Sequence, residues 1–421
     1  MGIGPLRPRV LYISYDGALE PLGQSQVIAY LERLTSSAEI TLLSFEKAAD
    51  LADRPRVLAM RRRLDGAGIR WIARRYHKRP PVVSTALDVV GGCIEARRWA
   101  RRPAEAAGVP AIAHARGYVP ALVALYAKRR LGARFLFDMR GFWIDEKVEA
   151  GYWARGGMLY RVGKWCERRF LAEADAVVSL TAAGVRELPA LGPVRDGVPV
   201  VVIPTCADVD RFTPESPAPQ TEVALKHDLG LEGAMVVGYV GTLSNWYLRA
   251  ETLSYLAWLC RRFDRARVLM VTREDHNRLR ADAERAGIPG EKLVMVRAAF
   301  DEMPRFIRLM NVGVFFIRVC FSKRASAATK LAEFLASGVP VVINDGIGDS
   351  GEIVRAGRVG VVIEATTGHT FLAQSEALDA ILDDPGTPRR CRDLAARAFS
   401  LTSGVAQYEA LYGRLSSPSG P

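Results

Sequence analysis

The sequence predicts an α/β protein of two domains, each built on a parallel sheet. Strand-length apolar runs alternate with helical patterns along the 421 residues, the order produced by parallel strands and their crossover helices. A polar stretch with Pro214, Pro217 and Pro219 interrupts this alternation near the middle of the chain, as a domain linker would. At about 200 residues each, both parts are long enough to bury a core of their own.

Seven strands and the helices between them are expected in the first half. The strands are predicted at Val10–Ser14, Ile40–Phe45, Ile69–Ala73, Ala111–His114, Phe135–Asp138, Ala176–Leu180 and Val200–Ile203. Helices are predicted over residues 24–36, 53–65, 84–102, 118–130, 158–173 and 182–189. Each helical pattern lies between two strands, as parallel pairing requires.

Six further strands are expected after the linker. They are predicted at Val236–Val240, Val268–Val271, Leu293–Val296, Val312–Phe316, Val341–Ile343 and Val359–Ile363. The tail from about Phe371 to Leu415 has a helical pattern. We therefore predict one domain over 1–210, a second over 211–400, and a C-terminal helix and tail over 401–421.

Composition favours a soluble protein with reduced cysteines. The chain is 49% hydrophobic and 8% aromatic, and no stretch approaches the roughly 20 apolar residues of a membrane span. The first residues, MGIGPLRPRVLYISYD, lack the apolar core of a signal peptide. The six cysteines are scattered, without a C-x-x-C pair or metal-ligand spacing, so we expect free thiols in a cytoplasmic protein.

The positive charge is concentrated in the first half of the chain. The net charge is +12, and residues 1–210 hold 32 Lys and Arg against 22 Asp and Glu, a net of +10. Ten of these cations lie in Arg54–Pro81, with Asp65 as the single acid. Such a patch fits an anionic membrane surface or a lipid diphosphate, although a solvated basic face explains it equally. No recognition-helix or RNA-binding motif accompanies the charge, so nucleic acid is not expected.

Residues 321–354, FSKRASAATKLAEFLASGVPVVINDGIGDSGEIV, form the most informative segment. We expect Ser326 to cap a helix whose first turn is 327–329 and which ends at Gly338. Lys323 and Arg324 precede that cap, and Lys330 lies one turn inside. Because the start of a helix already attracts anions, three cations there predict a diphosphate site.

Glu333 follows Lys330 at i+3, so both side chains point the same way. A carboxylate beside a diphosphate pocket is suited to accept hydrogen bonds from two ribose hydroxyls. A surface helix carrying a Lys–Glu pair is the alternative interpretation of the same residues.

At these residues the chain resembles the family-4 glycosyltransferases, which are retaining enzymes of the GT-B fold. That family usually carries two Glu eight positions apart, and Glu333 matches the second, which contacts the donor ribose. Ala325 stands at the place of the first, so the sugar contacts of that Glu are not carried over. The SKRAS…TK helix start and the GDS loop are similar to a variant branch of the family.

The resemblance covers nearly the whole chain and implies its architecture. Two Rossmann-like domains would place their parallel sheets face to face across a deep cleft. Residues 1–210 would bind the acceptor and residues 211–400 the nucleotide sugar. The last helix would pack back towards the N-terminal domain.

Further donor contacts are expected from two glycine-containing turns. Gly23 permits close approach to a ligand and Gln24 offers donors; in the family this turn faces the donor sugar and phosphate, whereas an ordinary capped turn explains it as well. The turn lacks G-x-G-x-x-G, which counts against a dinucleotide dehydrogenase. In the loop at Asp349 and Ser350, side chains would hold sugar hydroxyls or cap a helix.

The family's usual phosphate-binding Arg and Lys are missing after the first strand of the second domain. Residues 242–247 occupy their places, with Arg249 slightly later. We infer that diphosphate binding has moved to Lys323, Arg324 and Lys330. Gly241, Trp246 and Tyr247 would then shape the pocket.

Polar residues at the ends of two neighbouring strands form the candidate site of the first domain. His114 and Arg116 end the fourth strand, and Asp138 and Arg140 follow the fifth; such strand ends share a crevice. The family places a His here near the donor sugar and the acceptor, so His114 and Arg116 are our catalytic candidates. Asp138 and Arg140 would bind the acceptor, or Asp138 would orient an Arg.

Residues 142–165 contain three of the seven Trp. They would form an acceptor-binding wall, a lid that touches the membrane, or a packed helix. Within this segment Asp145 is a candidate contact for acceptor hydroxyls.

Together these features predict a retaining glycosyltransferase of the hexosyltransferase type. It would move a sugar from a nucleoside diphosphate sugar to a saccharide or lipid-linked hydroxyl acceptor, in cell-surface polysaccharide or glycolipid synthesis. Lys330 would stabilise the leaving diphosphate, so neither metal nor cofactor is expected. We expect a cytoplasmic protein, with peripheral attachment to the inner face of the cell membrane through Arg54–Arg79 left open. The alternatives are a GT-B-fold sugar-nucleotide epimerase and a non-catalytic sugar- or nucleotide-binding protein.

Overall fold

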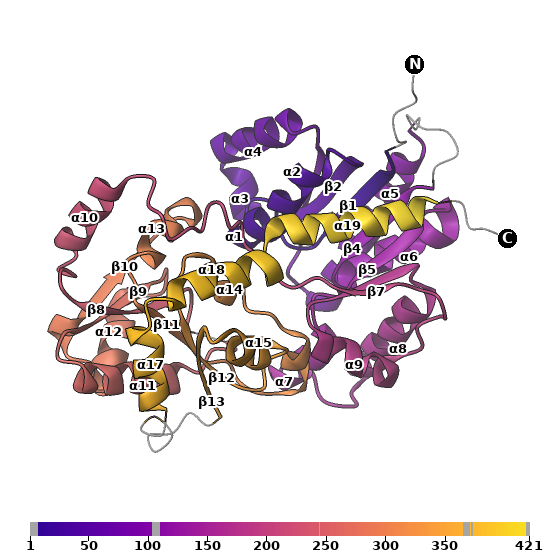
Figure 1. Ribbon diagram of the computed structural model, residues 1–421. Helices are drawn as coiled ribbons and strands as arrows, with labels where there is room; N and C mark the ends of the chain where they lie inside the picture. The colour runs from indigo at the N-terminus through magenta and orange to yellow at the C-terminus, as the bar shows by residue number, and fades with distance from the viewer. Residues whose placement is uncertain (1–6, 103–109, 244, 365–370, 372–373, 418–421) are drawn as a thin grey trace. The chain divides into compact units, whose positions relative to one another are not determined.

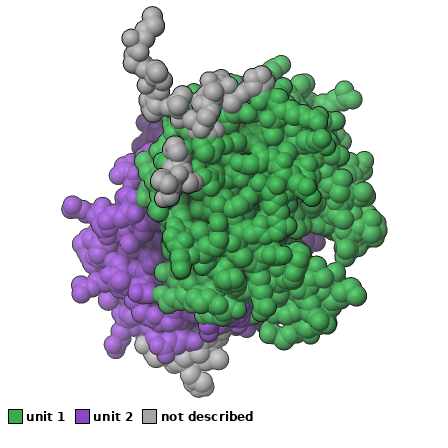
Figure 2. Space-filling model, turned by 90° about the vertical axis from the view of Figure 1, so that its right-hand side faces the viewer, with its two compact units in different colours: residues 1–204, 401–421 green, residues 205–400 purple. Residues whose placement is uncertain are grey.

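The computed structural model describes residues 7–102, 110–243, 245–364, 371 and 374–417. The chain forms two compact units, one of residues 1–204 with 401–421 and one of residues 205–400, coloured green and purple in Figure 2. The predicted boundary after residue 210 lies six residues beyond this division. Residues 418–421 of the predicted tail lie outside the described part of the chain.

The first unit contains a seven-stranded parallel sheet in the order β3-β2-β1-β4-β5-β6-β7. Its strands are β1 (Arg9–Ser14), β2 (Glu39–Glu46), β3 (Arg70–Arg75), β4 (Ile112–Arg116), β5 (Arg134–Asp138), β6 (Ala176–Ser179) and β7 (Val200–Val202). All seven predicted strands are confirmed. Most of them read as continuous apolar runs because helices cover both faces of a parallel sheet.

The helices of the first unit follow the predicted pattern with some divisions. They are α1 (Pro21–Gly23), the π-helical turn η1 (Gln24–Ile28), α2 (Ala29–Leu34), α3 (Ala48–Ala52), α4 (Arg54–Gly66), α5 (Pro81–Ala100), α6 (Tyr118–Leu131), α7 (Trp143–Glu149), α8 (Met158–Glu173), α9 (Ala182–Leu191) and α19 (Leu401–Ser416). The single helix expected over 24–36 is therefore two consecutive pieces, η1 and α2, preceded by the short α1. The C-terminal helix α19 returns to this unit and packs on α2 and β4 (Figure 1).

The second unit contains a six-stranded parallel sheet in the order β10-β9-β8-β11-β12-β13. Its strands are β8 (Met235–Val240), β9 (Ala266–Val271), β10 (Leu293–Val296), β11 (Val312–Phe315), β12 (Val341–Asn344) and β13 (Gly360–Ile363). Its helices are α10 (Pro219–Asp228), α11 (Arg249–Arg262), α12 (His276–Arg285), η2 (Gly290–Lys292), η3 (Phe300–Glu302), α13 (Met303–Ile307), η4 (Phe321–Ala325), α14 (Thr329–Ala336), α15 (Ser350–Gly357), α17 (Ser375–Asp383) and α18 (Thr387–Ala398). All six predicted strands are confirmed.

Strand register places the candidate residues of the first unit at one edge of its sheet. In the pairing of β4 with β5, Arg116 lies opposite Asp138, and Ser14 of β1 lies opposite Arg116. The carboxyl ends of β1, β4 and β5 therefore meet, which is where open α/β sheets bind ligands. None of the helices in the described part of the chain has both the length and the apolar character needed to cross a bilayer.

Candidate active site

The helix that carries the predicted donor site begins later than expected. α14 starts at Thr329, with Ala328 at its N-cap and no side-chain cap. The prediction that Ser326 caps this helix is wrong, because residues 321–325 close a separate 3₁₀ turn, η4. The N–H of Ser326 donates to the carbonyl of Lys323 (3.2 Å), and its own backbone is extended. Lys323 and Arg324 therefore lie on η4, before the start of α14.

The predicted end of α14 is confirmed. Gly338 has a φ of +74°, a conformation that glycine adopts without strain. The N–H of Gly338 donates to the carbonyl of Leu335 (3.0 Å), and that of Val339 donates to Phe334 (2.9 Å). These two bonds form a Schellman motif.

Lys330 is a buried cation surrounded by aromatic rings. Its Nζ lies 3.7 Å from the ring centroid of Tyr247 and 4.4 Å from that of Tyr239, and it donates to the Tyr239 hydroxyl (3.3 Å). Among the described residues, no carboxylate lies within 4 Å of this ammonium. Burial lowers the pKa of Lys330 from 10.5 to about 7, although the charge of Glu333 opposes the shift.

Glu333 lies one turn further along α14 and is also buried. Burial raises the pKa of its carboxyl to about 7, against the opposing charges of Lys330 and Arg211. Arg211 itself donates to the carbonyl of Phe300 (2.8 Å) and lies 4.2 Å from that ring. The Lys–Glu pair is thus buried, which argues against the alternative of an exposed surface pair.

Gly241 brings bare backbone next to the Lys330 ammonium. It follows β8 with a φ of +95°, and a Cβ at this position would lie 3.5 Å from Nζ. Any other residue would be strained there and would cover the side of the ammonium that glycine leaves open. Gly241 is therefore suited to a close approach by a ligand.

The ring of Trp246, the residue before Tyr247, contacts two more cationic side chains. The Nζ of Lys323 lies 3.8 Å from its ring centroid, and the guanidinium of Arg318 lies 4.5 Å away. Two consecutive aromatic residues thus hold the side chains of Lys323 and Lys330. Within the segment expected to shape this pocket, residue 244 lies outside the described residues.

Arg324 and Arg249 occupy different surroundings. Arg324 is exposed, 5.8 Å from the Phe321 ring. Arg249 is held by ion pairs to Glu274 and to Asp282 (2.6 Å). The buried positive charge of this site therefore comes from Lys323 and Lys330.

The predicted GDS loop contacts η4 directly. The N–H of Gly348 donates to the carbonyl of Lys323 (2.9 Å). Asp349 is the N-cap residue of α15 without a side-chain cap bond, and Ser350 is the buried first residue of that helix. The structure thus brings this loop and Lys323 together.

In the first unit, Asp138 is the centre of a buried polar cluster. Its Oδ2 accepts a hydrogen bond from the Tyr408 hydroxyl (2.9 Å) and lies 3.7 Å from Nε2 of His114. Nη1 of Arg140 is 4.0 Å away. Burial alone would raise the pKa of Asp138, but Arg140, His114 and Arg116 together hold it below its usual value. Asp138 is therefore a carboxylate near neutral pH.

His114 is fully enclosed in this cluster. Its Nδ1 lies 2.7 Å from the Tyr412 hydroxyl, and its ring packs on Tyr12 with centroids 4.3 Å apart. Burial lowers the pKa of His114, although Asp138 opposes the shift, so the imidazole is neutral at pH 7. The prediction of direct catalytic contact stays untested, and in this geometry His114 links Asp138 to α19.

Arg116 and Arg140 complete the cluster. Nε of the buried Arg116 lies 3.5 Å from Oδ2 of Asp16. Arg140 has a φ of +55°, which is uncommon for a non-glycine residue and concentrates at functional sites. Sequence reasoning found His114, Arg116, Asp138 and Arg140, but it missed the tyrosines because α19 lies almost 300 residues from β4.

The remaining predicted residues lie outside this cluster. Gly23 packs so tightly that a Cβ would lie 1.9 Å from the Gly17 carbonyl oxygen, and Gln24 donates to the carbonyl of Leu19 (3.3 Å). Gly23 ends α1 and Gln24 begins η1, and the prediction that they bind the donor stays untested. Asp145 on α7 pairs with Lys164 (2.7 Å), and none of its contacts among the described residues reaches the Asp138 cluster.

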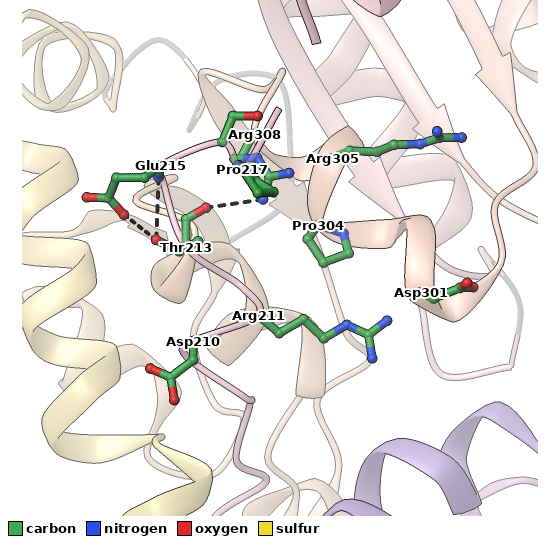
Figure 3. Close-up of a pocket in the computed structure, with 10 residues that line it drawn as sticks. Asp210, Arg211, Thr213, Glu215, Pro217, Asp301, Pro304, Arg305 and Arg308 are labelled. Carbon is green, nitrogen blue, oxygen red and sulfur yellow. Dashed lines mark hydrogen bonds between the residues drawn. The ribbon is translucent and has the colours of Figure 1, made fainter. Parts of the chain in front are cut away.

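A pocket of about 420 Å³ in the second unit lies elsewhere (Figure 3). It is lined by Asp210, Arg211, Thr213, Glu215, Ser216, Pro217, Asp301, Pro304, Arg305 and Arg308. Arg308 is paired with Glu222 (2.6 Å), and none of the predicted site residues lines this pocket. Across the described residues, no group of three His, Cys, Asp or Glu side chains could hold a metal ion.

Part of the chain matches a known family model. Residues 25–206 match the family model of a glycosyl transferase 4-like domain. No curated protein sequence matches the chain. Residues 25–206, which cover most of the first unit, are therefore similar to that domain.

Solved structures share the fold across both units. A glycosyltransferase from Rickettsia africae ESF-5 superposes with a TM-score of 0.72 at 14% identity, covering 98% of this chain and 100% of that one. HepE from Anabaena, in complex with UDP and glucose, gives 0.68 at 14% identity over 96% and 99%. Sucrose-phosphate synthase from Thermosynechococcus elongatus gives 0.69 at 14% identity over 97% and 99%. The fold is that of GT-B-type glycosyltransferases, as predicted.

Proposed function

We propose that this protein is a retaining glycosyltransferase that uses a nucleoside diphosphate sugar as donor. The observation that carries the proposal is the buried Lys330 ammonium, beside Glu333 and the bare backbone of Gly241. A buried cation without a paired anion is costly, and the donor diphosphate would supply that anion. The UDP and glucose bound by HepE make a nucleotide sugar the ligand to expect.

The second unit would stabilise charge on the leaving group. Breaking the anomeric C–O bond leaves negative charge on the departing diphosphate. The ammonium groups of Lys330 and Lys323 would stabilise that charge as it develops. Glu333 would accept hydrogen bonds from the ribose hydroxyls, and Asp349 and Ser350 would bind the sugar.

Retention would follow from attack on the same face of the sugar. The acceptor oxygen forms the new bond to the anomeric carbon while the bond to the diphosphate breaks. The acceptor proton passes to the departing phosphate oxygen, so the protein needs no nucleophile. In the first unit, Asp138 would orient Arg140, and His114 would hold Asp138 in place.

We also propose that transfer requires no metal, because Lys323 and Lys330 supply the charge that Mg²⁺ supplies elsewhere. Turnover should then persist after treatment with EDTA. Complete loss of turnover that Mg²⁺ restores would contradict this part of the proposal.

The acceptor we propose is a saccharide or lipid-linked hydroxyl, in cell-surface polysaccharide or glycolipid synthesis. The cations of α4 support a lipid-linked substrate, because Arg54, Arg61 and Arg62 are exposed. A protein with these cations should bind anionic vesicles in a salt-dependent manner.

The test is an assay of nucleotide release from UDP-, GDP-, TDP- and ADP-sugars, with and without lipid and saccharide acceptors. A transferase forms a glycosylated acceptor and releases the nucleoside diphosphate. An epimerase of the same fold would alter the sugar without any acceptor, and a binding protein would release nothing. Either of these two results would overturn the proposal.

A further inference from the structure

Helix α5 carries its acidic residues on the inside and aliphatic residues on the outside. Asp88 is buried, accepting a hydrogen bond from Tyr15 (2.7 Å) and lying 2.6 Å from Nδ1 of His77. Glu95 is buried against Arg74 (3.2 Å). The outer face instead presents aliphatic side chains that are 47% to 60% exposed, namely Val82, Val83, Leu87, Val90 and Ile94.

Four of these side chains form one stripe along the helix. Val83, Leu87, Val90 and Ile94 are spaced by three or four residues, so they lie on the same face. At 1.5 Å per residue the stripe is about 16 Å long. Single exposed aliphatic residues are common, whereas a continuous apolar patch indicates an interaction surface.

Both ends of the stripe are positively charged. Lys78 and Arg79 are exposed immediately before α5. Arg97 and Arg101 are exposed at its other end, where they continue the same helical spacing, and the exposed Arg98 beside them pairs with Glu95 (2.9 Å). The only acids of α5 are Asp88 and Glu95, and both face inward. The outer face is therefore apolar in the middle and cationic at the ends.

We propose that the outer face of α5 is a membrane-binding surface that inserts its aliphatic side chains among anionic lipids. Interfacial helices combine an apolar face with Lys and Arg that pair with lipid headgroups. A protein partner fits less well, because the stripe lacks the aromatic side chains that are enriched in protein interfaces. The proposal stands independently of glycosyl transfer, and it places membrane contact on α5, beyond the basic residues of α4.

The test is flotation of the full chain with vesicles of phosphatidylglycerol and phosphatidylcholine in equal parts. The double variant Leu87→Glu/Ile94→Glu should lower the bound fraction by at least about tenfold, because it places two charges in the inserted stripe. The control is Val223→Glu, which places a charge at another exposed aliphatic position, on α10 of the second unit. This control should bind vesicles like the wild type.

A second variant measures the contribution of the cationic ends to vesicle binding separately from that of the apolar stripe. Arg97→Gln/Arg101→Gln should weaken binding to anionic vesicles several-fold and reduce its salt dependence. Because all these positions are exposed, each variant should unfold at the wild-type temperature. If the Glu variant unfolds earlier, Leu87→Ser/Ile94→Ser replaces it.

Three results would overturn the proposal. The first is wild-type protein that fails to bind anionic vesicles, and the second is a stripe variant that binds as tightly as the wild type. The third is a stripe variant that changes only self-association in sedimentation, which would assign the stripe to a second copy of the chain. Nucleotide-induced thermal stabilisation is measured on the same samples. Loss of nucleotide binding with vesicle binding intact would remove the proposed function and leave this inference standing.

Discussion

The Nζ atom of Lys330 lies 3.7 Å from the centroid of the Tyr247 ring. The negative face of an aromatic ring attracts a cation, but it compensates only partly for the water that burial removes. Because no carboxylate within the described residues lies at ion-pair distance from this ammonium, the unliganded protein holds a cation that destabilises its folded state.

Lys330→Met should therefore stabilise the folded protein at pH 6 by roughly 2–4 kcal/mol. The lysine has a folded pKa of about 7 against its usual 10.5, so the unfolded chain binds more protons between these two values. The destabilisation is fully present below pH 7 and disappears as the pH rises towards 10.5. Chemical denaturation at pH 6 and pH 10 measures the difference. A variant less stable than the wild type at pH 6 would contradict this account, and Lys226→Met on α10 is the control.

Donor binding should weaken above pH 7 and should be accompanied by proton uptake. A bound diphosphate favours the charged form of Lys330, whereas the free protein has already lost that proton above its pKa of about 7. The dissociation constant should rise up to about tenfold per pH unit above 7 and stay level just below it. Calorimetry in buffers of different ionisation enthalpy counts the protons. Constant affinity from pH 6 to pH 9 would exclude Lys330 as the phosphate ligand.

Glu333→Gln should raise the donor KM about tenfold, the scale of one hydrogen bond to a charged group, and leave kcat less affected. The reason is that a ribose contact is made in both the ground state and the transition state. Kinetics with varied donor test this, with Glu352→Gln on the exposed side of α15 as the control. An unchanged KM would show that Glu333 does not contact the donor and has a structural role.

Tyr408→Phe should lower kcat with little change in donor KM. The substitution removes the 2.9 Å hydrogen bond to Asp138, so the carboxylate orients Arg140 less well while the donor site stays intact. Loss of a hydrogen bond by a buried carboxylate should also cost about 1–3 kcal/mol of stability. The exposed Tyr152→Phe is the control. A stability loss with unchanged kcat would make Tyr408 purely structural.

The sheets and the end of α14 were predictable because their signals are local. Apolar runs of strand length specify parallel strands covered on both faces, and Gly338 before Val339 and Pro340 specifies a helix end. The start of α14 was predicted wrongly. Serine is a preferred helix N-cap residue, but Ser326 follows the 3₁₀ turn η4 and does not begin α14. Nothing in the local sequence decides between a cap and a second turn.

The contacts between distant segments were beyond sequence reasoning. Tyr408 and Asp138 are 270 residues apart, and only the return of α19 to the first unit brings them together. Which face of α5 is buried could not be predicted from the sequence, for a related reason. Its pattern separates an aliphatic face from an acidic one, but the partners of Asp88, which are Tyr15 and His77, decide which face is buried.

Binding of the donor diphosphate by Lys330 is tested by calorimetric titration of UDP, GDP, TDP and ADP into the wild type and Lys330→Met at pH 7. One nucleotide should bind the wild type, and the variant should lose at least about a hundredfold in affinity for it, as expected when a buried charge partner is removed. Lys226→Met should bind like the wild type. Binding of equal strength in Lys330→Met, or no binding by the wild type to any of the four, would contradict the assignment of the donor diphosphate to Lys330.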